Sequence, residues 1–185
     1  DIQKHDGCVV TNKPPLDPLQ KYLGGYPQAT RDQVARMLEE QTLAGWLRRR
    51  YARPHDIRSD KQLYDYTMAL KNEFLGKVGP LNRVHYDNRI QVIQHALGQH
   101  HFISRVHGGR LKAVNEIRIA SVFRDSPEAF LKMIVVHELA HFREKEHNKA
   151  FYQMCCHMEP EYHQLEFELR VYLVCLEVEG EIYGG

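Results

Sequence analysis

The sequence predicts an α+β fold, in which helices flank a small antiparallel or mixed sheet and one buried helix binds a metal ion. Apolar residues recur at helical spacing before residue 76 and again after residue 126. Between residues 81 and 123 they alternate with polar residues, as in strands. The pentapeptide His-Glu-Leu-Ala-His, at 137–141, lies in the second helical region. With 185 residues, of which 43% are hydrophobic, the chain is expected to fold as one globular domain.

The N-terminal part of the chain is expected to be irregular first and helical afterwards. Residues 1–26 contain three prolines and a Gly-Gly pair, which predicts an irregular segment ahead of a single domain over 27–185. One helix is predicted over 28–52, because it ends in three arginines that suit a helix C-terminus. A second helix is predicted over 60–75, since its apolar residues recur at helical spacing and Gly76 is a typical stop.

The middle of the chain is expected to supply the sheet. Alternating residues on both sides of Asp87-Asn88 predict a first hairpin over 83–93. The Gly-Gly pair at 108–109 suits a tight hairpin turn, so a second hairpin is predicted over 103–114. Residues 116–123 then resemble a last strand before the helix that carries the pentapeptide.

The pentapeptide contains the central candidates for the site, His137, Glu138 and His141. On a helix the two histidines leave the same side, one turn apart, so one divalent metal ion can bind both. Ser126-Pro127-Glu128 predicts where this helix begins, with an N-cap, a proline at the first position and an acid in the first turn. In zinc hydrolases with this motif the glutamate takes a proton from the metal-bound water. Glu138 is therefore the candidate catalytic base.

His147 is the candidate third ligand, because a catalytic zinc site uses three protein ligands and keeps one position open. It follows His141 by six residues, so it can reach the same ion only if the helix ends between them. The polar run 143–146 favours such a break, and so does Asn148, a residue type that caps helices.

Further candidates lie downstream of the pentapeptide. If His147 faced solvent, Glu161 or Glu166 would complete the metal site. Glu144 stands where metzincins have a turn glycine, and a left-handed turn there would cost about 1 kcal/mol. Glu144 and Glu146 are also candidates to orient a ligand. A donor to the developing oxyanion is expected among four side chains: Tyr152, His157, Tyr162 and His163.

Composition and charge restrict the partners and the compartment. The net charge of +1 argues against bulk attraction to nucleic acid or membrane, and no apolar run approaches the roughly 18 residues of a membrane span. The absence of a secretory pattern and the low cysteine content predict a cytoplasmic protein.

Cys155 and Cys156 are expected to be small core residues, and His100-His101 is expected to lie in a loop. None of the four cysteines shows C-x-x-C spacing: Cys8, Cys155, Cys156 and Cys175.

The predicted sheet region has a local excess of positive charge, with seven basic and two acidic residues between 83 and 124. Basic side chains on strands commonly protect sheet edges from aggregation. If several of them converged above the metal, they would favour a polyanionic substrate such as a nucleotide. The basic residues are Arg83, Arg89, Arg105, Arg110, Lys112, Arg118 and Arg124.

Six runs of residues carry a family resemblance: Gly25–Pro27, Tyr86–Asn88, Ser104–Gly109, Glu116–Arg124, Ile134–Tyr152 and Cys155–Phe167. In these runs the chain resembles the YgjP-like family of predicted metal-dependent hydrolases. The resemblance extends over residues 22–176. It implies a zincin-like fold, with His137, His141 and His147 as metal ligands and Glu138 as catalytic acid and base.

Three functions remain open at this point. The first is a zinc-dependent hydrolase with a metallopeptidase-like site, whose peptide substrate lies along an edge strand; zinc is favoured by ligand type over other divalent transition metals. The second follows from the resemblance, because YgjP-like proteins are also described as UTP pyrophosphatases, although the sequence lacks a glycine-rich phosphate loop. The third is a non-catalytic module with a structural metal, which three ligands and an open position argue against.

Overall fold

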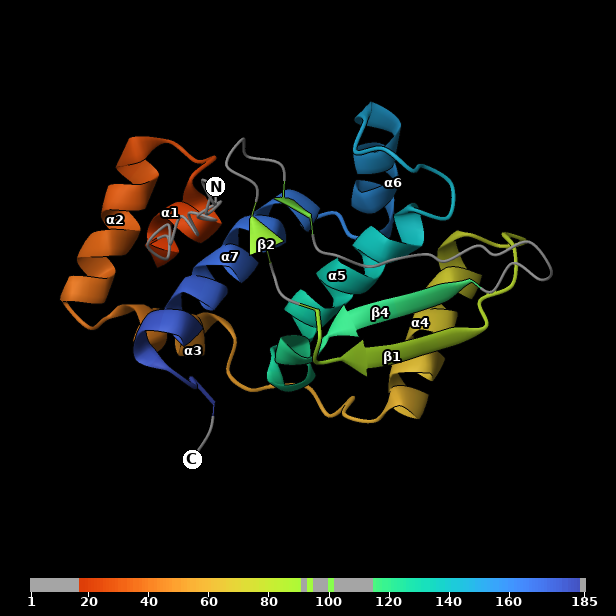
Figure 1. The fold of residues 1–185 in the computed structure, drawn as a ribbon, viewed down its shortest axis with the longest axis horizontal. Helices are drawn as coiled ribbons and strands as arrows, with labels where there is room; N and C mark the ends of the chain where they lie inside the picture. The colour runs from red at the N-terminus through yellow and green to blue at the C-terminus, as the bar shows by residue number, and fades with distance from the viewer. Residues whose placement is uncertain (1–16, 91–92, 95–99, 102–114, 184–185) are drawn as a thin grey trace, which may run out of the picture.

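The computed structural model describes residues 17–90, 93–94, 100–101 and 115–183, and confirms a single α+β domain (Figure 1). The helices are α1 (Pro18–Leu23), α2 (Gln28–Glu39), α3 (Leu43–Arg50), α4 (Asp60–Phe74), α5 (Glu128–Ala140), α6 (Lys149–Met158) and α7 (Tyr162–Glu179). The strands are β1 (Arg83–Asp87), β2 (Ile93–Gln94), β3 (His100–His101) and β4 (Glu116–Ala120), and the 3-10 helix η1 (Ser121–Asp125) follows β4. The second predicted hairpin, over 103–114, lies outside the described residues.

The main sheet consists of β1 and β4, which pair in parallel from Arg83 opposite Glu116 to Asp87 opposite Ala120. The prediction of a hairpin over 83–93 is therefore wrong, because the described part of its second strand, β2, pairs with β3 instead. Alternation reveals which side chains are buried but does not reveal the partner strand. His100-His101 likewise forms β3 and not a loop.

Two expectations about the N-terminal half are corrected. The segment expected to be irregular up to residue 26 contains helix α1, which begins with Pro18 and buries Leu23 where α1 packs against α7. The helix expected over 28–52 is divided into α2 and α3, because Gln41 adopts a left-handed conformation with φ of 56°. The helix expected over 60–75 is confirmed as α4, which begins with a capping box between Ser59 and Gln62.

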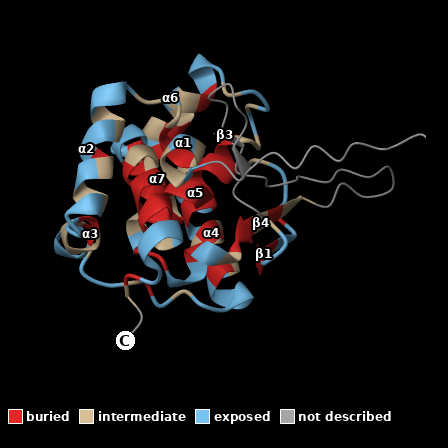
Figure 2. Cartoon of the chain, turned by 60° about the vertical axis from the view of Figure 1, so that its left-hand side comes forward, coloured by how far each residue is buried: buried red, intermediate tan, exposed pale blue. Residues whose placement is uncertain are grey.

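The core is centred on α5 and α7, where buried residues concentrate (Figure 2). Ten of the 13 residues of α5 are buried, and the first four residues of the pentapeptide lie on this helix, whereas His141 is its C-cap and is half-buried. α5 contacts the sheet through β4 and contacts both α6 and α7 (Figure 1). The N-cap of α5 is Pro127. The predicted cap, Ser126, instead donates a hydrogen bond from its hydroxyl to the carbonyl of Phe123 at 3.0 Å. None of the described helices has the length and apolar character that crossing a membrane requires.

Candidate metal centre

The centre forms where α5 ends. α5 stops at Ala140, and the amide of Glu144 donates to the carbonyl of Ala140 at 3.0 Å as the chain turns away. α6 begins at Lys149, and the side chain of its N-cap, Asn148, accepts a hydrogen bond from the amide of Phe151 at 2.9 Å. The predicted break ahead of His147 is thus confirmed, but α5 ends at Ala140, earlier than the polar run 143–146 indicated. The break returns the chain towards α5.

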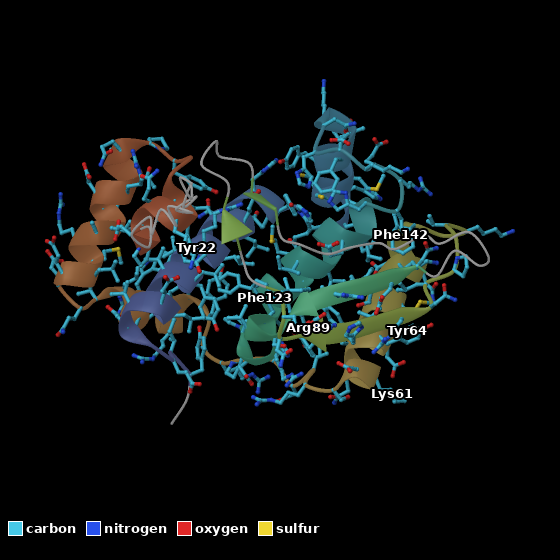
Figure 3. All side chains as sticks on the ribbon, in the orientation of Figure 1. Tyr22, Lys61, Tyr64, Arg89, Phe123 and Phe142 are labelled. Carbon is cyan, nitrogen blue, oxygen red and sulfur yellow. The ribbon has the colours of Figure 1, made fainter. Side chains whose placement is uncertain are left out.

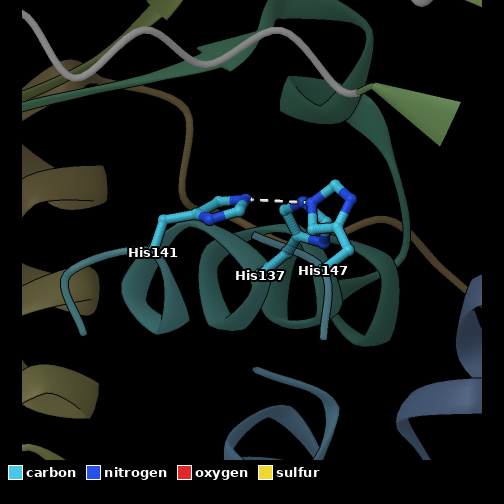
Figure 4. Close-up of side chains that lie close together, drawn as sticks. All are labelled: His137, His141 and His147. Carbon is cyan, nitrogen blue, oxygen red and sulfur yellow. Dashed lines mark hydrogen bonds between the residues drawn. The ribbon is translucent and has the colours of Figure 1, made fainter. Parts of the chain in front are cut away.

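The three predicted ligand residues meet at this break (Figure 4). One ring nitrogen from each of His137, His141 and His147 lies within 4.8 Å of the other two. The ring centroids are 4.9 to 5.0 Å apart in all three pairs. Within the described residues these three side chains are the group that could hold a metal ion.

The spacing of two nitrogens fits a shared metal ion. The Nε2 atoms of His141 and His147 are 3.1 Å apart. Two ligands about 2.0–2.1 Å from a tetrahedral zinc ion lie roughly 3.3 Å from each other. The Nδ1 of His141 is 2.9 Å from the carbonyl oxygen of Glu144, and a carbonyl only accepts, so Nδ1 must carry the proton. The lone pair of the neutral ring is then on Nε2, where it would be available to a metal ion.

The surroundings of the cluster are apolar and aromatic. The ring of Phe151 packs against all three imidazoles, with centroid distances of 4.6 to 5.0 Å. His137 is only 5% exposed, and its Nδ1 is 2.8 Å from the hydroxyl of Tyr162. Phe151 did not stand out in the sequence, because an aromatic residue on a helix is usually an ordinary core residue.

Glu138 follows His137 on α5 and is 2% exposed. On a helix it projects about 100° away from its neighbour, close to the ligand face without sharing it. Ionisable groups buried beside potential metal ligands are typical of reactive sites. Glu138 is therefore buried on the helix that carries His137, and its part as catalytic base stays a prediction.

The other acidic candidates do not join the cluster. Glu144 contributes its backbone carbonyl to His141, while its carboxylate accepts from the Asn148 amide at 3.2 Å. Gln41 is the only non-glycine of the described residues with positive φ, so Glu144 lacks the expected left-handed strain. Glu166 pairs with Arg170 at 2.9 Å, and Glu161 is the N-cap of α7.

The four candidate donors to an oxyanion are placed differently. Tyr162 contacts His137, as described above. Tyr152 lies beside His147, with ring centroids 6.4 Å apart, and also contacts His163, with ring centroids 5.5 Å apart. His157 instead packs edge-on against Phe74 of α4. Burial raises the pKa of Tyr152, so its hydroxyl keeps its proton at neutral pH and remains a donor.

Three of the four described basic residues of the sheet region are engaged in ion pairs. Arg89, labelled in Figure 3, reaches back to Asp87 at 3.1 Å, and its hydrogen bonds lower the pKa of that carboxyl to about 2. Arg83 and Arg118 pair with Glu116 at 3.5 and 3.3 Å. Arg124 lies over the ring of Tyr86. The remaining three, Arg105, Arg110 and Lys112, lie outside the described residues.

The three cysteines of the described residues form no disulfide. Cys155 and Cys175 are buried, and burial raises the pKa of each thiol to about 12. Cys156 is partly exposed, so only Cys155 of the vicinal pair is confirmed as a core residue. Cys8 lies outside the described residues.

Comparisons with known proteins agree with this arrangement. Residues 104–172, which contain Glu138 and the three histidines, match the family described as YgjP-like, metallopeptidase domain. The UTP pyrophosphatase of Escherichia coli (strain K12) is 57% identical over 157 residues, which cover 85% of this chain and 94% of the relative. No solved structure gave a significant match. The chain therefore belongs to the YgjP-like family and is a metal-dependent hydrolase.

Proposed function

We propose that this chain is a zinc-dependent hydrolase that splits UTP into UMP and pyrophosphate. The convergence of three imidazoles beside a buried glutamate supports hydrolysis as the reaction type. The observation that carries the choice of substrate is the 57% identity to a UTP pyrophosphatase along 94% of that protein's length.

His137, His141 and His147 would hold the zinc ion. Neutral imidazole nitrogens are among the ligands that zinc prefers, and three of them leave a position open for chemistry. When bound, zinc lowers the pKa of a coordinated water towards about 7 and stabilises negative charge that develops nearby.

Glu138 would act as the general base. A carboxylate oxygen of Glu138 takes a proton from the attacking water, whose oxygen forms a bond to the α-phosphorus. The bond between that phosphorus and the oxygen bridging to the β-phosphorus breaks, and the proton passes from Glu138 to the released pyrophosphate. One water is consumed, and Glu138 returns to its ionised form.

Tyr152 would assist as a hydrogen-bond donor. Its ring lies beside His147, and its hydroxyl stays protonated because burial raises its pKa. A fixed donor near the reacting phosphorus stabilises the charge that builds on the non-bridging oxygens.

Peptide hydrolysis is the second candidate, because the matching family is described as a metallopeptidase domain. The same base and ligands serve either reaction, since both need an attacking water and a stabilised oxyanion. A closed structural metal site is disfavoured, because the cluster found among the described residues has three members and a structural zinc site normally has four.

A parallel substrate screen separates these functions. Purified protein is incubated with the four common nucleoside triphosphates and with casein peptides, with and without a chelator, and products are followed by phosphorus NMR and chromatography. We expect UMP and pyrophosphate from UTP, loss of this activity after chelation, and recovery when zinc is added. The variant His147→Ala is the matched control that should stay inactive with zinc present.

Two outcomes would contradict the proposal. Cleavage of peptides but not of UTP would reject UTP as the substrate in favour of peptides, while the proposed metal site would stand. Cleavage of UTP that survives complete removal of metal would exclude the metal mechanism.

A further inference from the structure

We infer that Tyr162 is the positioning residue that orients His137 towards the other two imidazoles, through the hydrogen bond between its hydroxyl and the Nδ1 of His137. The inference rests on the metal site of the proposed function but not on the choice of UTP as substrate. It assigns to the first residue of α7 a part in building a site whose ligands come from α5 and the loop before α6.

The contact between Tyr162 and His137 is direct and shielded from water. The Tyr162 hydroxyl is 2.8 Å from Nδ1 of His137, and Tyr162 is fully buried. The two rings are nearly parallel, with 16° between their planes and 6.5 Å between their centroids. A short hydrogen bond in a dry environment is stronger than one in water, so it restricts the rotation of the imidazole.

A second group bears on the direction of this hydrogen bond. The thiol of Cys155 on α6 and the hydroxyl of Tyr162 influence each other's pKa, so the sulfur is the candidate acceptor for the proton of the tyrosine. If the tyrosine donates its single proton to the sulfur, its oxygen remains available to accept from Nδ1 of His137. The proton of the neutral imidazole then resides on Nδ1, and the lone pair of Nε2 points to the metal position.

His141 provides an internal parallel for this arrangement. Its Nδ1 also meets an acceptor, the carbonyl of Glu144, at 2.9 Å. Metal-binding histidines usually have such a partner on the second nitrogen, and removing the partner typically weakens metal binding by about 10- to 100-fold. Tyr162 would accept a hydrogen bond from the Nδ1 of His137, as a backbone carbonyl does from the Nδ1 of His141, and it would add no charge to the core.

The variant Tyr162→Phe tests this role, because it removes the hydroxyl and keeps the ring. Zinc affinity is measured by competition with a chromophoric chelator, and the tautomer of His137 by nitrogen-15 NMR on zinc-free protein. We expect zinc affinity about 10- to 100-fold lower, and a loss of the preference for a proton on Nδ1. The matched control is Tyr172→Phe, the same change at a buried tyrosine on the same helix that packs against Phe130.

Two further variants keep the test decisive if Tyr162→Phe folds poorly. Cys155→Ser retains a side chain that can accept from the tyrosine hydroxyl, whereas Cys155→Ala removes the acceptor. We expect zinc affinity close to wild type in the first and clearly reduced in the second. Equal affinity in both would contradict the assigned direction of the hydrogen bonds.

The positioning role is overturned if Tyr162→Phe and Tyr172→Phe bind zinc equally well and the tautomer of His137 is unchanged. These outcomes are independent of substrate. A wild-type protein that binds zinc but does not cleave UTP would reject the proposed substrate, and the comparison of the two tyrosine variants would still decide the role of Tyr162.

Discussion

At the scale of single residues, the candidate centre shows how neutral groups can orient a ligand set. The carbonyl of Glu144 holds the Nδ1 of His141, so the identity of the Glu144 side chain matters little to that contact. The sequence singled out Glu144 for its carboxylate, whereas the structure uses its backbone. Sequence patterns describe side chains, and contacts made by main-chain atoms depend on the path of the chain.

The sharpest residue-scale prediction concerns Glu138. The variant Glu138→Gln should bind zinc as wild type does, because the residue is not among the three proposed ligands, and its turnover should fall by about 100- to 10,000-fold. Zinc content by atomic absorption and steady-state turnover of UTP check both parts. Unchanged turnover would remove Glu138 from the mechanism, and loss of zinc would make it a ligand.

A second residue-scale prediction concerns pH and the buried Glu168 on α7. Burial acts to raise the pKa of Glu168, but hydrogen bonds from Arg50, Tyr51 and Gln164 outweigh it, so the pKa is lowered. An acid whose pKa is lower in the folded state stabilises the fold above its unfolded pKa of about 4.3. This stabilisation is lost as the pH falls through the folded-state pKa.

The free energy of unfolding of the variant Glu168→Gln should therefore be about 1–2 kcal/mol lower than that of wild type at pH 7, and this difference should shrink as the pH falls from about 5 to 3. Urea unfolding at several pH values measures the difference. Glu73→Gln, at an exposed acid of α4, is the control and should have little effect. An equal loss of stability at pH 7 and pH 3 would refute the linkage to ionisation.

At the scale of elements, the sequence predicted best where local signals decide. The polar run 143–146 and the cap at Asn148 predicted a break ahead of His147, which the structure has, although α5 already ends at Ala140. The break brings His147 back to the cluster. The division into α2 and α3 had no such signal, because Gln41 is neither glycine nor asparagine yet adopts a left-handed conformation. The pairing of β1 with β4 joins segments far apart in sequence, so local alternation cannot reveal it.

The cap of α6 gives an element-scale prediction, because Asn148 starts the helix next to His147. The variant Asn148→Ala should cost about 1 kcal/mol of stability, and it should also weaken zinc binding several-fold, since the loop that holds His147 loses its anchor. Ser59→Ala removes the equivalent cap of α4 and is the matched control. Ser59→Ala should lower the free energy of unfolding in urea by a similar amount and leave zinc affinity, measured by chelator competition, unchanged. Equal zinc affinity in the two variants would show that the cap at Asn148 does not position His147.

At the scale of the whole molecule, the candidate metal centre lies where three elements of the core meet. His137 is on α5, His147 precedes α6, and Tyr162 begins α7. α5 also packs on the sheet through β4, so the centre is connected to both parts of the fold. A ligand that binds the folded state alone stabilises it by mass action, so an ion held here should strengthen the entire domain.

Thermal unfolding with and without zinc tests this connection. Free zinc at about 100 times its dissociation constant contributes about 2.7 kcal/mol, which for a domain of this size corresponds to a rise in Tm of about 5–10 °C. A chelator should reverse the rise, and His147→Ala should show little of it, because two imidazoles hold zinc much more weakly than three. The α4 variant Ser59→Ala should start from a lower Tm and show the full rise, since Ser59 caps a helix that carries none of the proposed ligands. A Tm that zinc leaves unchanged in wild type, or raises equally in His147→Ala, would mean that the three imidazoles do not share one ion in the folded chain.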